Sequence, residues 1–116
     1  MNLLDTTVVL ELLESRKYRA GSISIVTILE ILRGLEAGKR EKVKELLEES
    51  FQVLALDNEV VKTYCSLYRK LKDVGSQVPD ADLLIAATAM SHDMTIETRD
   101  EHFKRLGALG LKLAKP

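Results

Sequence analysis

Four carboxylates in this sequence occupy positions from which they could share one divalent metal ion. Asp5 and Asp100 each follow a short run of apolar or β-branched residues. Glu30 and Asp82 lie in longer apolar segments. Two carboxylates about 5 Å apart repel each other by roughly 3 kcal/mol at an effective dielectric near 20, so a fold that gathers several usually binds a cation. Oxygen ligands without Cys or His at ligand spacing favour Mg²⁺ or Mn²⁺, which assist phosphodiester hydrolysis.

Three of these acids, taken singly, also have a structural explanation. Asp5 and Asp100 could each accept a hydrogen bond from the first turn of a following helix. Glu30 could form a surface ion pair with Arg33, three residues further along the same helix. Only their order and their placement in the fold would join them into a site.

The fourth acid lies at the start of a helix, close to a second carboxylate. Asp80 directly follows Pro79 and is expected to cap this helix. Asp82 then falls in the first turn, where the helix dipole favours its ionised form without requiring a cap. An ionised carboxylate is suited to binding metal.

Alternating short apolar runs and amphipathic segments predict the elements that position these acids. Helices are expected over 8–14, 24–38, 39–49, 59–74 and 81–91, with a helical turn over 100–106. Strands are expected over 2–4, 51–56, 95–98 and 109–113. This alternation predicts an α/β fold with a parallel sheet covered on both faces. The functional crevice of such a sheet lies beyond the carboxyl ends of its strands, where Asp5 and Asp100 fall.

Length and composition narrow the class of protein. The 116 residues suit one domain, residues 1–116. Lys and Arg number 17 and Asp and Glu number 18, giving a formal charge of −1, which argues against a basic nucleic-acid coat. Cys65, the only cysteine, excludes an intrachain disulfide, and no apolar run is long enough to cross a bilayer. We expect a cytoplasmic protein.

Four segments, in order, carry a resemblance to a known family. They are Leu4–Val8, Ile28–Gly34, Pro79–Ala87 and Thr98–Asp100, the last followed by Phe103. In these segments the chain resembles PIN-domain ribonucleases, and specifically the VapC toxins of bacterial and archaeal toxin–antitoxin pairs. The order and spacing of the segments extend the resemblance over essentially the whole chain.

The resemblance implies a three-layer α/β/α domain with a four- or five-stranded parallel sheet. It also implies metal-dependent cleavage of RNA, a homodimer, and a small antitoxin protein whose segment covers the acidic pocket. Asp5, Glu30 and Asp82 would hold Mg²⁺ or Mn²⁺, and Asp100 would complete or orient the ligand set. Water rather than a side chain would then attack the phosphorus.

Further residues near the four acids are expected to support them or to contact substrate. Thr7 stands where many relatives carry Asn, and its hydroxyl could hydrogen-bond a carboxylate or water. Thr98 precedes the last acid. Arg33 and Arg99 could contact phosphate, although each could equally pair with a neighbouring acid. His102 is not expected to be a ligand.

Two other functions remain open on the sequence. An Asp after a first strand also begins aspartate-dependent phosphotransfer proteins, but Thr7 occupies the position where phosphatases of that kind carry a second Asp. The chain could also be a stand-alone RNA-processing nuclease, or an inactive PIN-like module that binds RNA or protein. Cys65, Tyr64 and Tyr68 are expected to be core residues on one helical stripe.

Overall fold

Five short parallel strands form the centre of the molecule in a computed structural model that describes residues 2–116. The strands are β1 (Leu3–Leu4), β2 (Ser22–Ser24), β3 (Gln52–Leu54), β4 (Thr95–Glu97) and β5 (Lys112–Ala114). The helices are α1 (Thr6–Ser15), α2 (Ile25–Arg33), α3 (Ala37–Ser50), α4 (Asn58–Asp73), α5 (Asp80–Ser91), the 3₁₀ helix η1 (Glu101–Phe103) and α6 (Lys104–Gly107). Short strands separated by one or two helices follow one another along the chain, as the sequence predicts apart from β2.

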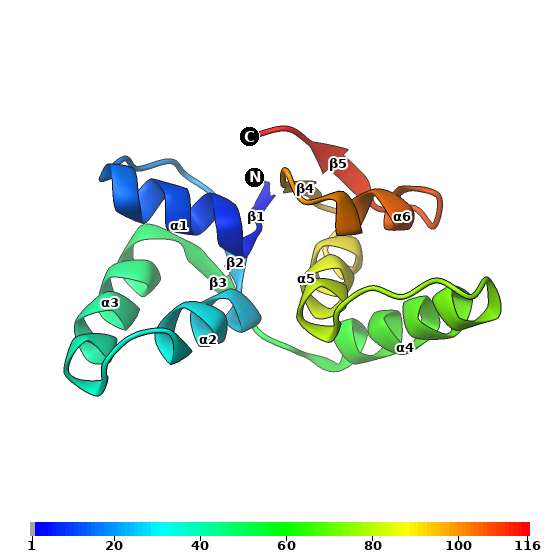
Figure 1. Ribbon diagram of the computed structural model, residues 1–116, viewed down its shortest axis with the longest axis horizontal. Helices are drawn as coiled ribbons and strands as arrows, with labels where there is room; N and C mark the ends of the chain where they lie inside the picture. The colour runs from blue at the N-terminus through cyan, green and yellow to red at the C-terminus, as the bar shows by residue number, and fades with distance from the viewer. Residues whose placement is uncertain (1) are drawn as a thin grey trace.

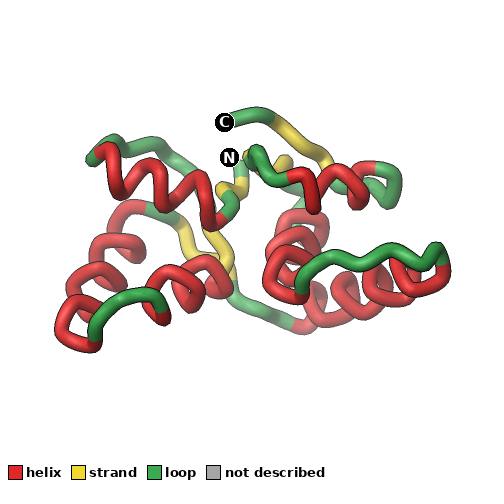
Figure 2. The backbone as a smooth tube through the Cα atoms, viewed as in Figure 1, coloured by secondary structure: helices red, strands yellow, loops and turns green. Residues whose placement is uncertain are grey.

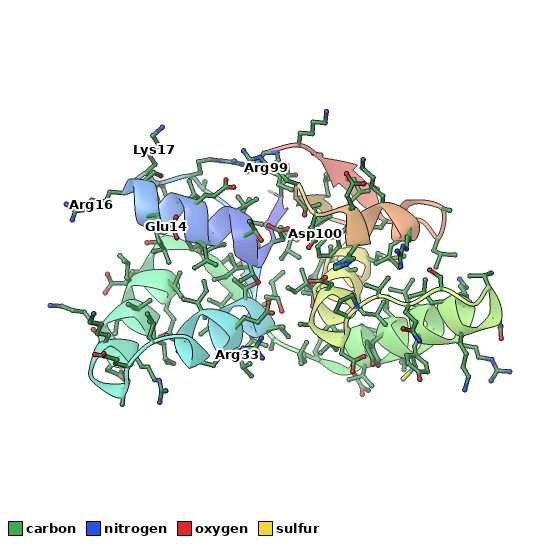
Figure 3. The ribbon with its side chains drawn as sticks, viewed as in Figure 1. Glu14, Arg16, Lys17, Arg33, Arg99 and Asp100 are labelled. Atoms are coloured by element: carbon green, nitrogen blue, oxygen red, sulfur yellow. The ribbon has the colours of Figure 1, made fainter. Side chains whose placement is uncertain are left out.

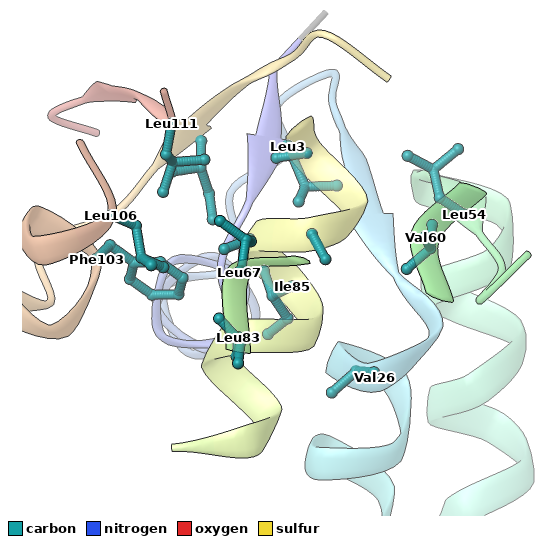
Figure 4. Packing of buried hydrophobic residues seen from close by; sticks show 14 of the residues in the cluster. Leu3, Val26, Leu54, Val60, Leu67, Leu83, Ile85, Phe103, Leu106 and Leu111 are labelled. Atoms are coloured by element: carbon teal, nitrogen blue, oxygen red, sulfur yellow. The ribbon is translucent and has the colours of Figure 1, made fainter. Parts of the chain in front are cut away.

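Two groups of helices lie on either side of the strands, with α1, α2 and α3 in one group and α4, α5 and α6 in the other (Figures 1 and 2). Leu3 and Leu4 are both fully buried, and they face opposite ways because successive side chains of a strand alternate. Leu4 packs in a cluster with Val8 and Val9 of α1. Leu3 packs in the larger cluster with residues of α4, α5 and α6 (Figure 4). This three-layer α/β/α arrangement confirms the expected fold class. No helix within residues 2–116 is long and apolar enough to cross a membrane.

The order of the strands, β3-β2-β1-β4-β5, reverses direction at one point. From β1 the chain builds outward through β2 to β3, then returns to place β4 on the other side of β1. Leu3 pairs with Ile96 and Leu4 with Glu97, so β1 and β4 end side by side. Such a reversal is where parallel sheets open a crevice for ligands. Asp5 follows directly after β1 at this point.

The structure differs from the sequence prediction in two elements on the β2 side. Strand β2 was not expected, because its one apolar residue, Ile23, stands between two serines; both serines are nevertheless fully buried. The helix expected over 24–38 ends at Arg33, and α3 begins at Ala37 after a turn that includes Gly34. Glycine is a weak helix former, so a break at Gly34 is consistent with its low propensity.

The expectation that Cys65 and Tyr68 lie in the core is wrong. Helix α4 packs along α5 and buries a neighbouring stripe that contains Val60, Leu67 and Leu71. Cys65 is exposed, and Tyr68 is 51% exposed. Both stripes of the helix are apolar, and contact with α5 decides which one is buried.

A buried ion pair at the end of β4 was also not expected. Glu97 is 6% exposed and accepts hydrogen bonds from the guanidinium of Arg19 and, at 3.1 Å, from the amide of Asn2. The bond from Arg19 lowers the pKa of the Glu97 carboxyl, against the opposing effect of burial. The pair ties the loop before β2 to the strand end beside the four acids.

Replacing Arg19 with Gln is expected to lower the free energy of unfolding at pH 7 by about 1–2 kcal/mol, because the buried carboxylate loses its charged partner. Since the pKa of Glu97 is lowered on folding, this contribution is present above the unfolded pKa of about 4.3 and is lost as pH falls through the folded pKa. Urea unfolding curves of parent and variant should therefore converge in acid.

Arg69→Gln provides the matched control, because it removes an exposed ion pair with Asp73. Such pairs contribute at most about 1 kcal/mol, so this variant should unfold close to the parent at every pH. An Arg19→Gln protein as stable as the parent at pH 7 would contradict the structural role given to the Arg19–Glu97 pair.

Candidate functional site

Asp5 is the most buried of the four acids, at 3% exposure. Its Oδ1 accepts a hydrogen bond of 2.9 Å from the backbone N–H of Val8 and so caps α1. Its Oδ2 accepts a hydrogen bond from the hydroxyl of Thr98, at the end of β4. Asp5 therefore caps α1 as expected, and these bonds hold its carboxylate between the ends of β1 and β4, where the strand order reverses. A carboxylate oxygen has more than one lone pair, so these bonds leave capacity for a further partner.

Thr98 links Asp5 to Asp100. The Thr98 hydroxyl donates to Asp5 and accepts a bond of 2.9 Å from the backbone N–H of Asp100. Asp100 in turn accepts a bond of 2.9 Å from the backbone N–H of His102 and caps the 3₁₀ helix η1. Both strand-end acids thus serve as caps and also belong to one hydrogen-bonded group.

Asp82 approaches Asp100 through His102, a residue that sequence reasoning left out. The Nδ1 atom of His102 lies 3.0 Å from Oδ2 of Asp82 and 3.3 Å from Oδ1 of Asp100. Asp82 and His102 are 20 positions apart in sequence, so spacing gave no signal. Their meeting depends on the packing of η1 against the start of α5.

The expectation that Asp80 caps α5 is wrong. The N-cap residue is Pro79, which makes no side-chain cap, and Asp80 is the first residue of the helix. Its carboxylate instead accepts a bond of 2.8 Å from the hydroxyl of Tyr64 on α4. Asp82 lies in the first turn, as expected, and faces the other acids.

Glu30 reaches the site from α2. The Thr6 hydroxyl donates to its Oε1 at 2.7 Å and lies 3.0 Å from the hydroxyl of Thr27. Its Oε2 lies 3.6 Å from Arg33, so the expected ion pair is also present. Thr7 is exposed, and among residues 2–116 no hydrogen bond joins it to an acid. The threonine that supports a carboxylate on this side is its neighbour, Thr6.

Each of the four acids repels at least one of the others. Burial raises the pKa of Asp5, and repulsion from Asp100 adds to the rise, while bonds from Thr98 and Val8 oppose it. Burial also raises the pKa of Asp82. Repulsion from Asp100 and from Glu30 adds to that effect, and the hydrogen bond with His102 opposes it. The carboxylates therefore lie close enough for each to act on at least one other.

Three of the described side chains offer ligand atoms within 4.8 Å of one another, namely Asp82, Asp100 and His102. Two carboxylate oxygens and an imidazole nitrogen form a reasonable ligand set for a divalent cation. Asp5 and Glu30 are not part of this closest group; repulsion from Asp100 raises the pKa of Asp5, and repulsion from Glu30 raises the pKa of Asp82. The arrangement fits a metal ion that would offset the charge of the acids.

The two arginines lie on different sides of the acids (Figure 3). Arg33 pairs with Glu30 on α2, and Arg99 pairs with Glu11 on α1. The side chains of Arg33 and Arg99 are mostly exposed, at 68% and 55%. Each arginine therefore forms an ion pair with an acid, which was one of the two roles expected for it. Each side chain also remains accessible to an anionic ligand.

Comparisons with known proteins agree with this geometry. A family model described as the PIN domain matches residues 3–109. Ribonuclease VapC1 of Methanocaldococcus jannaschii is 35% identical over 115 residues, covering 96% of this chain and 85% of the relative. The structure of VapBC-5 from Mycobacterium tuberculosis superposes with a TM-score of 0.74 at 27% identity over 99% of this chain and 98% of that one. VapBC-1 from nontypeable Haemophilus influenzae, at 22% identity, shares the fold with a TM-score of 0.83 over 98% and 96% of the two chains.

Asp82→Asn is expected to leave the metal-free protein at least as stable as the parent at pH 7, because a neutral amide removes repulsion from Asp100. Because folding raises the pKa of Asp82, protonation of this carboxyl stabilises the folded protein. This contribution to the free energy of unfolding is present below the unfolded pKa of about 3.9 and is lost as pH rises through the folded pKa. In thermal unfolding with chelator, the melting temperature of the parent should therefore rise relative to that of the variant as pH falls from 7.

Asp80→Asn is the control for this measurement, since it makes the same change in the same helix turn at an exposed position. Its amide oxygen can still accept the bond from Tyr64, so its melting temperature should follow that of the parent. If Asp82→Asn melts several degrees below the parent in chelator at pH 7, then Asp82 is a structural residue and the repulsive cluster is wrong.

Proposed function

Because the chain belongs to the PIN-domain family, we propose that it is a VapC-type toxin that hydrolyses RNA phosphodiester bonds at the four-acid site. The observation that carries this proposal is the joining of Asp5 to Asp100 through Thr98, where the order of the strands reverses. Asp82 and Glu30 complete the group from α5 and α2. Two relatives named as VapC ribonucleases are 35% and 32% identical to this chain over the parts that align, which cover 96% and 70% of it.

We propose that Mg²⁺ or Mn²⁺ binds between the carboxylates of Asp82 and Asp100, with Asp5 and Glu30 close by, and that the ring of His102 holds Asp82 and Asp100 in position. When bound, such an ion neutralises the phosphate charge and favours ionisation of water. The hydroxyls of Thr98 and Thr6 hold Asp5 and Glu30 in position. A fixed arrangement of charge costs no reorganisation during the reaction.

Water is the nucleophile in this proposal. Among the described residues, Cys65 is the only thiol, and it lies on the exposed stripe of α4 rather than among the acids. Thr98 and Thr6 have hydroxyls at the site, but each donates its proton to a carboxylate. Carboxylates positioned around a water and a phosphate suit hydrolysis without a covalent enzyme intermediate.

A small antitoxin protein is the proposed partner. The solved relatives include complexes named VapBC, from Mycobacterium tuberculosis among others, and FitAcB from Neisseria gonorrhoeae, at 27% and 28% identity. An antitoxin segment that covers the acids would block access of RNA to them, and a basic side chain on it would satisfy their charge. We place this inhibition in the cytoplasm, where an RNA substrate would be found.

We also propose that the chain forms a homodimer through the exposed apolar residues of α2 and α4. Ile25 and Leu29 of α2 are 39% and 58% exposed, and Val61 and Tyr68 of α4 are each 51% exposed. Val26 and Val60, their neighbours, both belong to the larger buried cluster, so each helix buries one side against the same core and leaves these apolar side chains on its outer side. Apolar residues that gather on the surface commonly mark an interface.

RNA cleavage in the presence of Mn²⁺ tests the proposed activity. The parent should degrade RNA, chelation should stop the reaction, and Asp5→Asn or Asp82→Asn should reduce the rate by at least about 100-fold, as expected for loss of electrostatic stabilisation. Asp80→Asn should retain the activity of the parent. Cleavage that survives chelator, or that persists in Asp5→Asn, would overturn the metal-nuclease proposal.

Sedimentation equilibrium of Val61→Glu tests the proposed dimer. A charge buried at an apolar interface is strongly unfavourable, so the variant should be monomeric at concentrations at which the parent is dimeric. Leu46→Glu is the matched control, because Leu46 is 49% exposed on α3, away from the proposed face. Equal masses for the parent and Val61→Glu would show that this face is not the interface.

A further inference from the structure

A hollow of about 600 Å³ adjoins the acid site on the side of the C-terminal segment. Thr98 and Asp100, both members of the site, form part of its wall. Arg99, Lys104 and Lys115 also line it. A phosphodiester held at the acids is part of a chain, so the adjoining nucleotides must cross a surface next to Asp100. This hollow is such a surface, and it carries three cations together with one acid besides Asp100, Glu101, which pairs with Lys104.

A second hollow, of about 570 Å³, continues from the first along α1. Arg99 lines both hollows and therefore stands where they join. The side chains of Lys17 and Arg19 add positive charge to the second hollow, and Glu11 and Glu14 add negative charge. Figure 3 labels Arg99 next to the C-terminal segment, with Glu14 and Lys17 toward the far end of α1. The two hollows thus extend from Asp100 along the outer side of α1.

The cations of these hollows differ in how firmly their present partners hold them. The pair of Arg99 with Glu11 is 55% and 46% exposed, so it contributes at most about 1 kcal/mol and is easily exchanged. Within residues 2–116, neither Lys17 nor Lys115 has an ion-pair partner. Arg19, in contrast, is held by a carboxylate that is only 8% exposed. Arg99, Lys17 and Lys115 are therefore the cations free to meet a new anion.

We propose that the two hollows form the track for the RNA strand on one side of the scissile phosphate, and that Arg99 exchanges Glu11 for a backbone phosphate. This inference rests on the proposed ribonuclease function. The planar guanidinium can bind two phosphate oxygens at once, which makes arginine the stronger phosphate ligand of the set. Lys115 and Lys17 would contact phosphates on either side. Contacts of this kind position the strand without reading its sequence.

Binding of a short fluorescein-labelled single-stranded RNA of uridines, followed by anisotropy in chelator, tests the track without cleavage. Arg99→Gln should weaken binding roughly tenfold, the effect of losing one charged hydrogen-bonded contact. It should also reduce the slope of log affinity against log salt by about 0.7, the value for one phosphate contact on a single strand. Lys115→Gln should act in the same direction, and Lys39→Gln, on exposed α3, should change neither quantity.

Glu11→Gln separates this exchange from a purely structural role of the ion pair. Removing Glu11 frees Arg99, so RNA should bind several-fold more tightly, whereas loss of a needed structural pair would weaken binding. Glu14→Gln is the charge-matched control, because Glu14 lines the same hollow but pairs with no arginine among residues 2–116. Combining Glu11→Gln with Arg99→Gln should give the affinity of Arg99→Gln alone, since Glu11 acts through that arginine.

Several outcomes would overturn the track. Arg99→Gln could bind RNA as the parent does, or Glu11→Gln and Glu14→Gln could tighten binding equally. In either case, a parent that still cleaves RNA with Mn²⁺ leaves the proposed function intact and rejects only the track. A parent that neither binds nor cleaves RNA would reject both. Unchanged RNA binding together with weaker binding of an antitoxin would assign the hollows to the protein partner instead.

Discussion

The parallel pairing of β1 with β4 is the contact on which the chemistry of this molecule depends. It sets the ends of two strands side by side where the order of the sheet reverses, and so brings Asp5 next to Thr98 and Asp100. Carboxylates gathered in this way repel one another, and burial adds to the cost. The fold offsets that cost with the groups that form it: helix N–H groups, a strand-end hydroxyl and the His102 ring. Capping and clustering are therefore one arrangement rather than two alternatives.

Much of this could be predicted from the sequence because strand ends and helix starts leave local signals. Asp5 directly follows β1, Asp100 comes shortly after β4, and Asp82 lies in the first turn of its helix, so the strand ends and the helix start predict that they share one edge of a parallel sheet. Their supporting residues leave no such signal. Nothing local distinguishes Thr6 from Thr7, yet only Thr6 reaches Glu30. His102 meets Asp82 only through the packing of η1 against α5.

The helices show a second limit of sequence patterns. Helix α4 has two adjoining apolar stripes, and periodicity does not say which one α5 covers. The prediction placed Cys65 and Tyr68 in the core, whereas the structure buries Val60 and Leu67. Strand β2 was not predicted because its sequence is mostly serine. It forms nevertheless, because β1 and β3 on either side pair with its backbone. In the proposals made above, the unburied stripe of α4 would contact a second subunit, and the hollows beside Arg99 would contact RNA.

Paramagnetic broadening by Mn²⁺ would test most directly whether the acids at the strand ends share one ion. In NMR spectra of the isotopically labelled protein, small additions of Mn²⁺ should first remove the amide signals of Thr98, Asp100 and His102, with Asp82 close behind. Excess Mg²⁺ should restore them by competition. Broadening that begins instead at the glutamates of α3, around Glu41 and Glu45, or that shows no site preference, would contradict a metal centre at the junction of β1 and β4.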